Sequence, residues 1–179
     1  MKSKSIAFRI IGGKFRGKKL VGMSNEKTRP TKDKVREAIF NIIGNKIRDA
    51  TALDVFAGSG AMGIEAISRG AKHVTFNDID SEAIKVIKQN LSAIKVENVL
   101  VFQKDYYALL SILPDKYDIV FLDPPYDMDI IAQGFLPLLN AGGIIIYERE
   151  TREVEEGDVR IYGNTTIEII TKTPTDINV

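Results

Sequence analysis

An apolar run typical of a buried strand ends in Asp123-Pro124-Pro125-Tyr126. Two consecutive prolines fix the backbone and remove two N–H donors, so they predict a rigid turn with free carbonyl groups. Asp123 and the Pro124 carbonyl could both accept hydrogen bonds from the exocyclic amino group of a nucleobase, directing its lone pair at a methyl carbon bonded to sulfur. Tyr126 could stack on a base that has left its own stack. These four residues are therefore candidate catalytic residues for methyl transfer to an amino nitrogen.

A glycine-rich segment earlier in the chain is typical of a nucleotide pocket. The residues from Gly58 to Gly63 match the pattern G-x-G-x-x-G, and Asp78 follows where a ribose-binding acid is expected. The glycines allow a tight turn and close approach of the backbone to a ligand, and the Asp78 carboxylate could accept hydrogen bonds from both ribose hydroxyls. In the alternative interpretation, the glycines only pack a strand against a helix. The pattern does not by itself separate S-adenosylmethionine from NAD.

Two further acids favour S-adenosylmethionine over NAD. Asp54 lies just before the glycines, where it would repel a pyrophosphate but could hold the loop or face the ammonium group of a methionine tail. Asp105 follows a later strand and could accept a hydrogen bond from the amino group of adenine. The candidate cofactor-binding residues from these segments are Asp54, Phe56, Gly58, Gly60, Asp78 and Asp105.

The spacing of apolar residues predicts the elements that must position these side chains. A helix is expected over residues 32–47, with Thr31 as its N-cap. Strands are expected over residues 52–58, 73–78, 98–105, 117–123, 142–150, 158–163 and 165–172, and further helices over residues 60–70, 81–95, 106–113 and 129–140. This alternation predicts an α/β fold with a mostly parallel seven-stranded sheet, helices on both faces and an antiparallel hairpin at one edge. Ligands of such sheets bind beyond the carboxyl ends of the strands, where the candidate residues lie.

Charge is distributed unevenly along the chain. Residues 1–36 contain twelve Lys or Arg and two acids, a net charge of +10, whereas the remainder has a net charge of −9. This asymmetry indicates that the N-terminal part meets a polyanion. Cations alternate with glycines and Phe15 over residues 9–20, which predicts a basic β-ribbon that contacts phosphates. The alternative is a solvated basic segment that binds nothing.

The candidate phosphate-contacting residues of this region are Arg9, Lys14, Arg16, Lys18, Lys19 and Arg29, and the family resemblance given below implies that the phosphates are those of RNA. We accordingly expect an RNA-contacting extension over residues 1–30 and a methyltransferase domain over residues 31–179.

The composition argues against several other classes of protein. A chain of 179 residues with 44% hydrophobic content can bury one core. It has no cysteine and a single histidine, His73, so neither a disulfide nor a metal site is expected. No run approaches the roughly 18 apolar residues of a membrane helix, and no apolar signal segment is present, so we predict a cytoplasmic protein without a membrane partner.

Several of these segments resemble the RsmD family of bacterial methyltransferases, which modify the N2 amino group of a guanine in 16S ribosomal RNA. The resemblance is carried by residues 9–20, 28–43, 53–71 and 121–127, and more loosely by residues 161–169. It implies a Rossmann-like class I fold, S-adenosylmethionine as methyl donor, and 16S rRNA of the small ribosomal subunit or its assembly intermediate as acceptor. It also implies that the segment from Thr31 to Arg36 closes over the methionine end of the cofactor. Asp78 departs from the family, in which Glu is frequent at this position, and either acid can bind a ribose.

Three other functions are left open by the residues. A DNA adenine-N6 methyltransferase would use the same Asp-Pro-Pro-Tyr chemistry, but the chain has no room for a separate DNA-reading domain. A noncatalytic RNA-binding or ribosome-assembly protein would have no reason to retain all the acids at the strand ends. A nicotinamide-dependent oxidoreductase would need a proton donor near the pocket, where only tyrosines are available.

Overall fold

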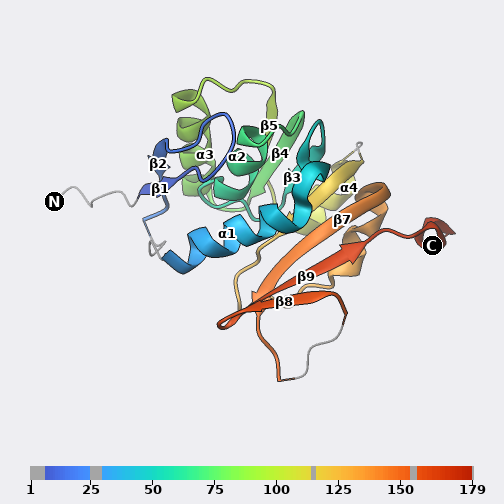
Figure 1. The fold of residues 1–179 in the computed structure, drawn as a ribbon. Coiled ribbons are helices and arrows are strands. Elements are labelled where there is room, and N and C mark those ends of the chain that lie inside the picture. Colours follow the sequence, from blue (N-terminus) through green and yellow to red (C-terminus); the bar gives the residue numbers. More distant parts are fainter. Residues whose placement is uncertain (1–6, 25–29, 114–115, 154–156, 179) are drawn as a thin grey trace.

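The computed structural model of the protein describes residues 7–24, 30–113, 116–153 and 157–178 (Figure 1). A seven-stranded sheet with the order β5-β4-β3-β6-β7-β9-β8 lies at its centre. Its strands are β3 (Thr51–Asp54), β4 (His73–Asp78), β5 (Val99–Gln103), β6 (Tyr117–Leu122), β7 (Leu139–Glu150), β8 (Val159–Tyr162) and β9 (Thr165–Thr171). The first five strands of this order run parallel, whereas β9 pairs antiparallel with β7 and with β8. The predicted mostly parallel sheet with an antiparallel edge is confirmed.

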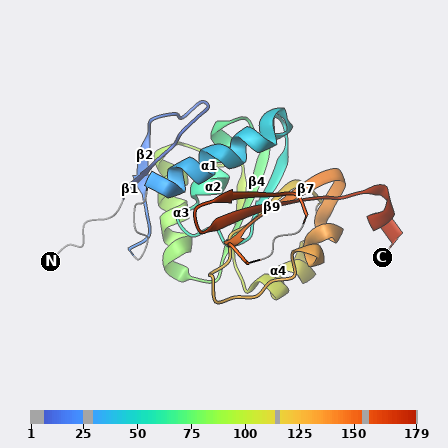
Figure 2. The same ribbon diagram turned by 60° about the horizontal axis from the view of Figure 1, so that its bottom comes forward.

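Helices cover both faces of this sheet (Figures 1 and 2). They are α1 (Pro30–Ile43), α2 (Ala61–Ser68), α3 (Ser81–Ala93) and α4 (Tyr106–Ile112), together with the 3-10 helices η1 (Gly44–Ile47), η2 (Ala132–Leu138) and η3 (Pro174–Asn178). Helices α1, α2 and α3 share a core cluster with Phe121 and Ile146, whereas α4 and η2 share a second cluster with Leu122 and Tyr147. Because successive strand residues point to opposite faces, β3, β6 and β7 each contribute to both cores.

Two expected helices differ from the structure. The α-helix expected over residues 129–140 is wrong, because only the 3-10 helix η2 forms there, with Pro137 inside it. Proline has no N–H to donate to the preceding turn, and Gly134 weakens the same segment. The helix α1 begins at Pro30, so Thr31 lies in its first turn and is not the N-cap. Proline is favourable at the first helical position, where its missing N–H would have no partner within the helix.

The N-terminal region forms a separate two-stranded antiparallel sheet, β1 (Ala7–Arg9) and β2 (Lys19–Val21). The basic β-ribbon expected over residues 9–20 is not confirmed, because the paired strands are short and residues 10–18, which include Lys14, Arg16 and Lys18, form the loop that connects them. Gly13 and Gly17 in this loop have φ values of 77° and 84°, a conformation that glycine adopts readily and other residues rarely. We call residues 10–18 the β1–β2 loop.

The β1–β2 loop is fixed to helix α2. The buried carboxylate of Glu65 accepts hydrogen bonds from the amides of Ile11 at 2.9 Å and Gly12 at 2.8 Å. A Cβ atom at Gly13 would lie 1.8 Å from the carbonyl oxygen of Ser68, so only glycine allows this close approach. The loop is therefore held against the helix that follows the glycine-rich segment.

Within the described ranges, no helix is both long enough and apolar enough to cross a membrane.

Candidate active site

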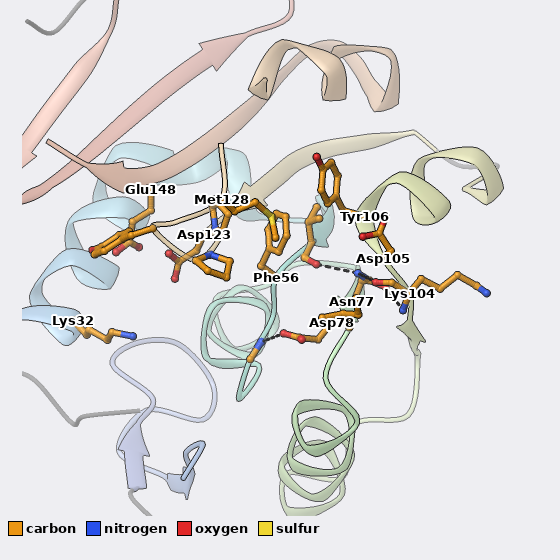
Figure 3. A pocket seen from close by; sticks show the side chains of 16 residues that line it. Lys32, Phe56, Asn77, Asp78, Lys104, Asp105, Tyr106, Asp123, Met128 and Glu148 are labelled. Atoms are coloured by element: carbon orange, nitrogen blue, oxygen red, sulfur yellow. Dashed lines mark hydrogen bonds between the residues drawn. The ribbon is translucent and has the colours of Figure 1, made fainter. Parts of the chain in front are cut away.

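A cavity of about 510 Å³ lies at the carboxyl ends of the parallel strands (Figure 3). Its lining includes the predicted site residues Phe56, Gly58, Asp78, Asp105, Asp123, Pro124, Pro125 and Tyr126. In the view of Figure 3, Asp123 lies toward one end, Asp78 and Asp105 lie toward the other, and Phe56 lies between them. An adjoining cavity of about 100 Å³ shares Phe56 and Asp123 and is also lined by Asp54. The sheet thus brings the candidate catalytic and cofactor-binding side chains to one place.

Asp78 ties the glycine-rich segment to the end of β4. Its Oδ2 accepts a hydrogen bond from the Gly58 amide at 2.8 Å, and its Oδ1 accepts one from the Asp80 amide at 2.9 Å. Gly58 and Gly60 have φ values of 53° and 83°, which permit the tight turn before α2. Each carboxylate oxygen has a further lone pair, so Asp78 can still accept hydrogen bonds from a ligand in the cavity.

Asp54, the last residue of β3, holds the start of helix α2 through a hydrogen bond. Its Oδ2 accepts a hydrogen bond from the Gly63 amide at 3.0 Å, and a Cβ at Gly63 would lie 2.3 Å from the ring of Phe76. Gly63, the third glycine of the pattern, therefore has to be glycine because helix α2 packs closely on strand β4 at this point. Burial raises the pKa of Asp54 to about 7 against the opposing hydrogen bond from Gly63, and the charges of Asp123 and Asp78 raise it as well. Asp54 therefore combines a loop-holding contact with a carboxyl that faces the smaller cavity.

Asp105 lies on the cavity wall at the start of α4. It is the N-cap of that helix, and its Oδ1 accepts a hydrogen bond from the Tyr107 amide at 2.9 Å. The side chain is exposed, so its remaining lone pairs face the cavity or solvent. The same carboxylate can therefore cap the helix and accept a hydrogen bond from a ligand.

The residues after β6 form a short loop at the mouth of the cavity. Pro124 is buried, whereas Asp123, Pro125 and Tyr126 are exposed, and Tyr126 retains 61% of its accessible surface. The Pro125 carbonyl accepts a hydrogen bond from the Met128 amide at 2.9 Å, which closes a turn. The loop therefore presents a carboxylate and an exposed aromatic ring to any molecule that enters.

Comparison with known proteins decides the family. The sequence profile described as Conserved hypothetical protein 95 matches residues 8–170. Ribosomal RNA small subunit methyltransferase D of Escherichia coli (strain K12) is 37% identical over 153 residues, which cover 83% of this chain and 76% of that protein. The chain belongs to the RsmD family of ribosomal RNA methyltransferases. The solved structure of yhhF from Escherichia coli, 30% identical, matches 93% of this chain and 98% of that chain with a TM-score of 0.84.

A more distant structure shares the fold alone. The 16S rRNA N2 methyltransferase RsmC of Thermus thermophilus, solved with S-adenosylmethionine and guanosine, is 18% identical and has a TM-score of 0.71. The match covers 94% of this chain and 50% of that chain. Together with yhhF, it establishes a Rossmann-like methyltransferase fold for this member of the RsmD family.

Of the predicted cofactor-binding residues, Gly60 and Thr31 are not placed at either cavity. Gly60 lines neither cavity, although it shapes the turn that does. Thr31 lies in the first turn of α1, but the structure does not describe its side chain. The predicted RNA-binding residue Arg29 lies wholly outside the described residues. No cluster of potential metal ligands occurs among the side chains that the structure describes.

Sequence reasoning missed several residues that line this RsmD-family cavity, among them Asn77, Lys32 and Glu148. Asn77 joins three strand ends, because its Nδ2 donates to the carbonyls of Val55 and Lys104, both at 3.0 Å, and its Oδ1 accepts from the Lys104 amide at 3.2 Å. Its only sequence signal is a polar residue inside an apolar strand. Lys32 on α1 and Glu148 on β7 line both cavities; Lys32 lies in the segment that the family resemblance assigned to the methionine end of the cofactor, whereas no local pattern marks Glu148.

The described RNA-binding candidates are exposed around the β1–β2 loop. Arg9, Lys14, Arg16, Lys18 and Lys19 all lie on the surface. The ammonium groups of Lys14 and Lys18 lie 5.2 Å and 5.5 Å from the centre of the Phe15 ring. Cations held near an aromatic face suit a nucleic acid, although RNA binding by these residues stays a prediction.

Proposed function

We propose that the chain transfers a methyl group from S-adenosylmethionine to the N2 amino group of a guanine in 16S rRNA of the small ribosomal subunit. The observation that carries this proposal is the shared cavity, because the Asp78 and Asp123 ends face one space of about 510 Å³. The class of acceptor follows from the family, since the Escherichia coli relative is named as a small-subunit ribosomal RNA methyltransferase.

The side chains of the cavity suit S-adenosylmethionine. Asp78 can accept hydrogen bonds from the ribose hydroxyls, Asp105 can accept one from the adenine amino group, and Ile79, 67% exposed on the same wall, offers an apolar surface to the adenine ring. Lys32 can face the carboxylate of the methionine tail, and Asp54 its ammonium group. When bound, S-adenosylmethionine supplies a methyl group activated by a sulfonium. A pyrophosphate would instead meet the repulsion of these acids.

Asp123 and Pro124 would position the acceptor nitrogen. The N2 amino group of guanine is a poor nucleophile, because its lone pair is delocalised into the ring. If the Asp123 carboxylate and the Pro124 carbonyl accept its two hydrogens, the nitrogen becomes more tetrahedral and its lone pair points at the methyl carbon. Tyr126 would stack on the base and hold it outside the RNA helix.

The transfer needs no strong base. S-adenosylmethionine held by Asp78 and Asp105 would supply the methyl group with a neutral thioether as leaving group, while Asp123 and Pro124 hold the attacking nitrogen in line. The methylated amino group is then acidic and loses one proton to Asp123, which returns it to water. Asp123 therefore acts chiefly by orientation and electrostatics.

The β1–β2 loop would supply the RNA contacts outside the cavity. Its exposed cations can neutralise phosphates, and its contacts with Glu65 on α2 keep it close to the cofactor end of the domain. The expected division into an RNA-contacting extension over residues 1–30 and a methyltransferase domain over residues 31–179 belongs to this proposal. So do a role for Arg29 in RNA contact and one for Thr31 at the methionine end of the cofactor.

The test is transfer of a labelled methyl group from S-adenosylmethionine to three acceptors. These are small ribosomal subunits that lack the modification, protein-free 16S rRNA and duplex DNA. We expect label in at least one ribosomal sample and none in DNA. Label in DNA adenine alone would contradict the proposed acceptor, and cofactor binding without transfer to any acceptor would favour a noncatalytic assembly role.

A further inference from the structure

Glu148 lies beside Asp123 at the reacting end of the cavity. Strands β6 and β7 are parallel neighbours in which Leu122 is paired with Tyr147. Asp123 and Glu148 are the next residues after this pair, so they lie side by side. Both residues line the main cavity and the smaller one, and Figure 3 shows their side chains close together. The base that Asp123 receives would therefore also meet Glu148.

The groups around Glu148 determine its protonation. Burial raises its pKa to about 8, the negative charge of Asp123, directly after β6, acts in the same direction, and Lys32 on α1 opposes both. Asp54 from β3 and Arg36 from α1 also line the smaller cavity with Glu148. At neutral pH the carboxyl therefore keeps its proton in the free protein, and it offers one O–H donor and one carbonyl acceptor.

The edge of guanine has a matching set of groups. The N2 amino group is followed along this edge by the N1–H donor and the O6 acceptor. Once Asp123 and Pro124 hold N2, the next groups along the edge are therefore one donor and one acceptor. A neutral carboxyl can pair with both of them, since its carbonyl accepts from N1–H while its hydroxyl donates to O6.

We propose that Glu148 reads the N1–H and O6 of the acceptor guanine while Asp123 holds its N2 amino group. This inference rests on the proposed function and makes Glu148 a specificity-determining residue of the same site. A second carboxylate charge beside Asp123 would repel O6, so the pairing uses the neutral form of Glu148.

Two variants separate this role from a structural one. Glu148→Gln keeps one donor and one acceptor without a titrating proton, whereas Glu148→Ala removes both. On small subunits that lack the modification, we expect Glu148→Ala to lower kcat/KM on the order of 10- to 100-fold, the discrimination typical of one bidentate base contact. Glu148→Gln should retain most of the wild-type value. The wild-type value should fall as pH rises through about 8, and that of Glu148→Gln should not.

An acceptor analogue tests the base contact itself. Small subunits are reconstituted with 16S rRNA that carries guanine or 2-aminopurine at the position that the wild type methylates. 2-Aminopurine keeps the N2 amino group but lacks both N1–H and O6. We expect the wild type to have a higher kcat/KM for subunits with guanine than for subunits with 2-aminopurine. The ratio of these two values should be smaller by about 10-fold or more in Glu148→Ala, as in a double-mutant cycle.

The outcomes distinguish the inference from the proposed function. An unchanged preference for guanine in Glu148→Ala, or an equal loss of activity in Glu148→Gln and Glu148→Ala, would overturn the role of Glu148 and leave the function intact. Failure of the wild type to methylate guanine N2 in any ribosomal sample would overturn both. Calorimetric binding of S-adenosylmethionine to each variant provides the control for intact folding.

Discussion

Asp54 links the stability of the site to pH. Its carboxyl is buried, and its pKa is raised from the ordinary 3.8 to about 7, chiefly by burial. A carboxyl with a higher pKa in the folded state binds its proton more tightly there than in the unfolded chain. Protonation of Asp54 therefore makes its full contribution to the stability of the folded state below about pH 4, and this contribution declines as the pH rises toward 7.

The variant Asp54→Asn should remove this dependence, because its side-chain oxygen can still accept from the Gly63 amide while nothing titrates. Between pH 5 and pH 8, the free energy of unfolding of the wild type should fall by about 2 kcal/mol more than that of the variant. Urea denaturation of the ligand-free proteins at each pH measures the difference. Parallel pH profiles for the two proteins would show that Asp54 is not the titrating group.

Asp78 should determine cofactor affinity through its charge. Asp78→Ala removes the acceptor for the ribose hydroxyls and the partner of the Gly58 amide. We expect the Kd for S-adenosylmethionine to rise on the order of 10- to 100-fold, the worth of a hydrogen bond to a charged group. The matched control is Asp78→Glu, which keeps a carboxylate and should bind within a fewfold of the wild type. Equal affinities for all three proteins in calorimetry would remove Asp78 from the binding site.

Site residues differed in how visible they were in the sequence. Asp123 could be predicted because it follows an apolar strand and precedes two prolines, and Asp78 because it ends a strand at the expected distance after the glycine-rich segment. Glu148 could not be predicted from the sequence, because its position beside Asp123 depends on the pairing of Leu122 with Tyr147 across two strands. A local pattern contains no information about that pairing.

At the scale of elements, Glu65 connects the N-terminal loop with two helices. Its buried carboxylate accepts from two loop amides and from the Arg69 Nε at 2.7 Å, and Arg36 of α1 lies 3.7 Å away. Arg36 also donates to the Arg9 carbonyl at 2.6 Å. Glu65 therefore holds the loop together with the contacts that Ser68 makes to Gly12, Lys14 and Phe15.

Glu65→Gln should loosen the loop without reaching the cavity. Removing the charge takes a carboxylate away from the buried Arg36, which keeps its contact with Asp33, and from the partly buried Arg69, so we expect a loss of about 3 kcal/mol in the free energy of unfolding. RNA affinity should fall as well, while the Kd for S-adenosylmethionine stays within a fewfold. A Glu65→Gln protein with wild-type stability in urea would argue that the loop is held by its remaining contacts.

The cations of the loop should act through phosphates. Reversing the charges of Lys14, Arg16, Lys18 and Lys19 should weaken RNA binding and reduce the slope of log K against log salt by about 3, since each phosphate contact contributes nearly one unit. The control reverses four exposed lysines elsewhere, Lys46, Lys85, Lys88 and Lys95. An unchanged salt slope in the first variant, or an equal change in the control, would exclude the loop from the RNA interface.

The elements themselves were predictable where the periodicity was strong. The strand β4 has the expected limits, residues 73–78, because an apolar segment is bounded there by polar residues. The segment around η2 was not predictable, since its apolar spacing is helical while Pro137 and Gly134 prevent an α-helix. The cations and glycines over residues 9–20 indicated a β-ribbon, and the short antiparallel pair of β1 and β2 forms there, but the pattern does not reveal that the connecting loop docks on α2.

At the scale of the whole molecule, the strand order creates the site. The chain fills the sheet from β3 outward through β4 to β5, and then returns to the other side of β3 with β6 and β7. This reversal places the ends of β3 and β6 side by side and leaves a crevice between the loops that follow them. Alternation of helices and strands predicted a parallel sheet, but the order of its strands depends on tertiary packing that the pattern does not encode.

The reversal also explains why two halves of a reaction meet in one cavity. The β3 and β4 ends present the candidate cofactor residues, and the β6 and β7 ends present Asp123 and Glu148. A substitution at Asp123 should therefore separate transfer from cofactor binding, because the ribose-binding acid lies toward the other end of the cavity.

The most direct measurement is nucleoside analysis of 16S rRNA after incubation of unmodified small subunits with labelled S-adenosylmethionine. The wild type should yield labelled N2-methylguanosine, and Asp123→Ala should yield almost none while its calorimetric Kd for S-adenosylmethionine stays near the wild-type value. A labelled nucleoside other than N2-methylguanosine, or parallel loss of cofactor binding in Asp123→Ala, would contradict the account.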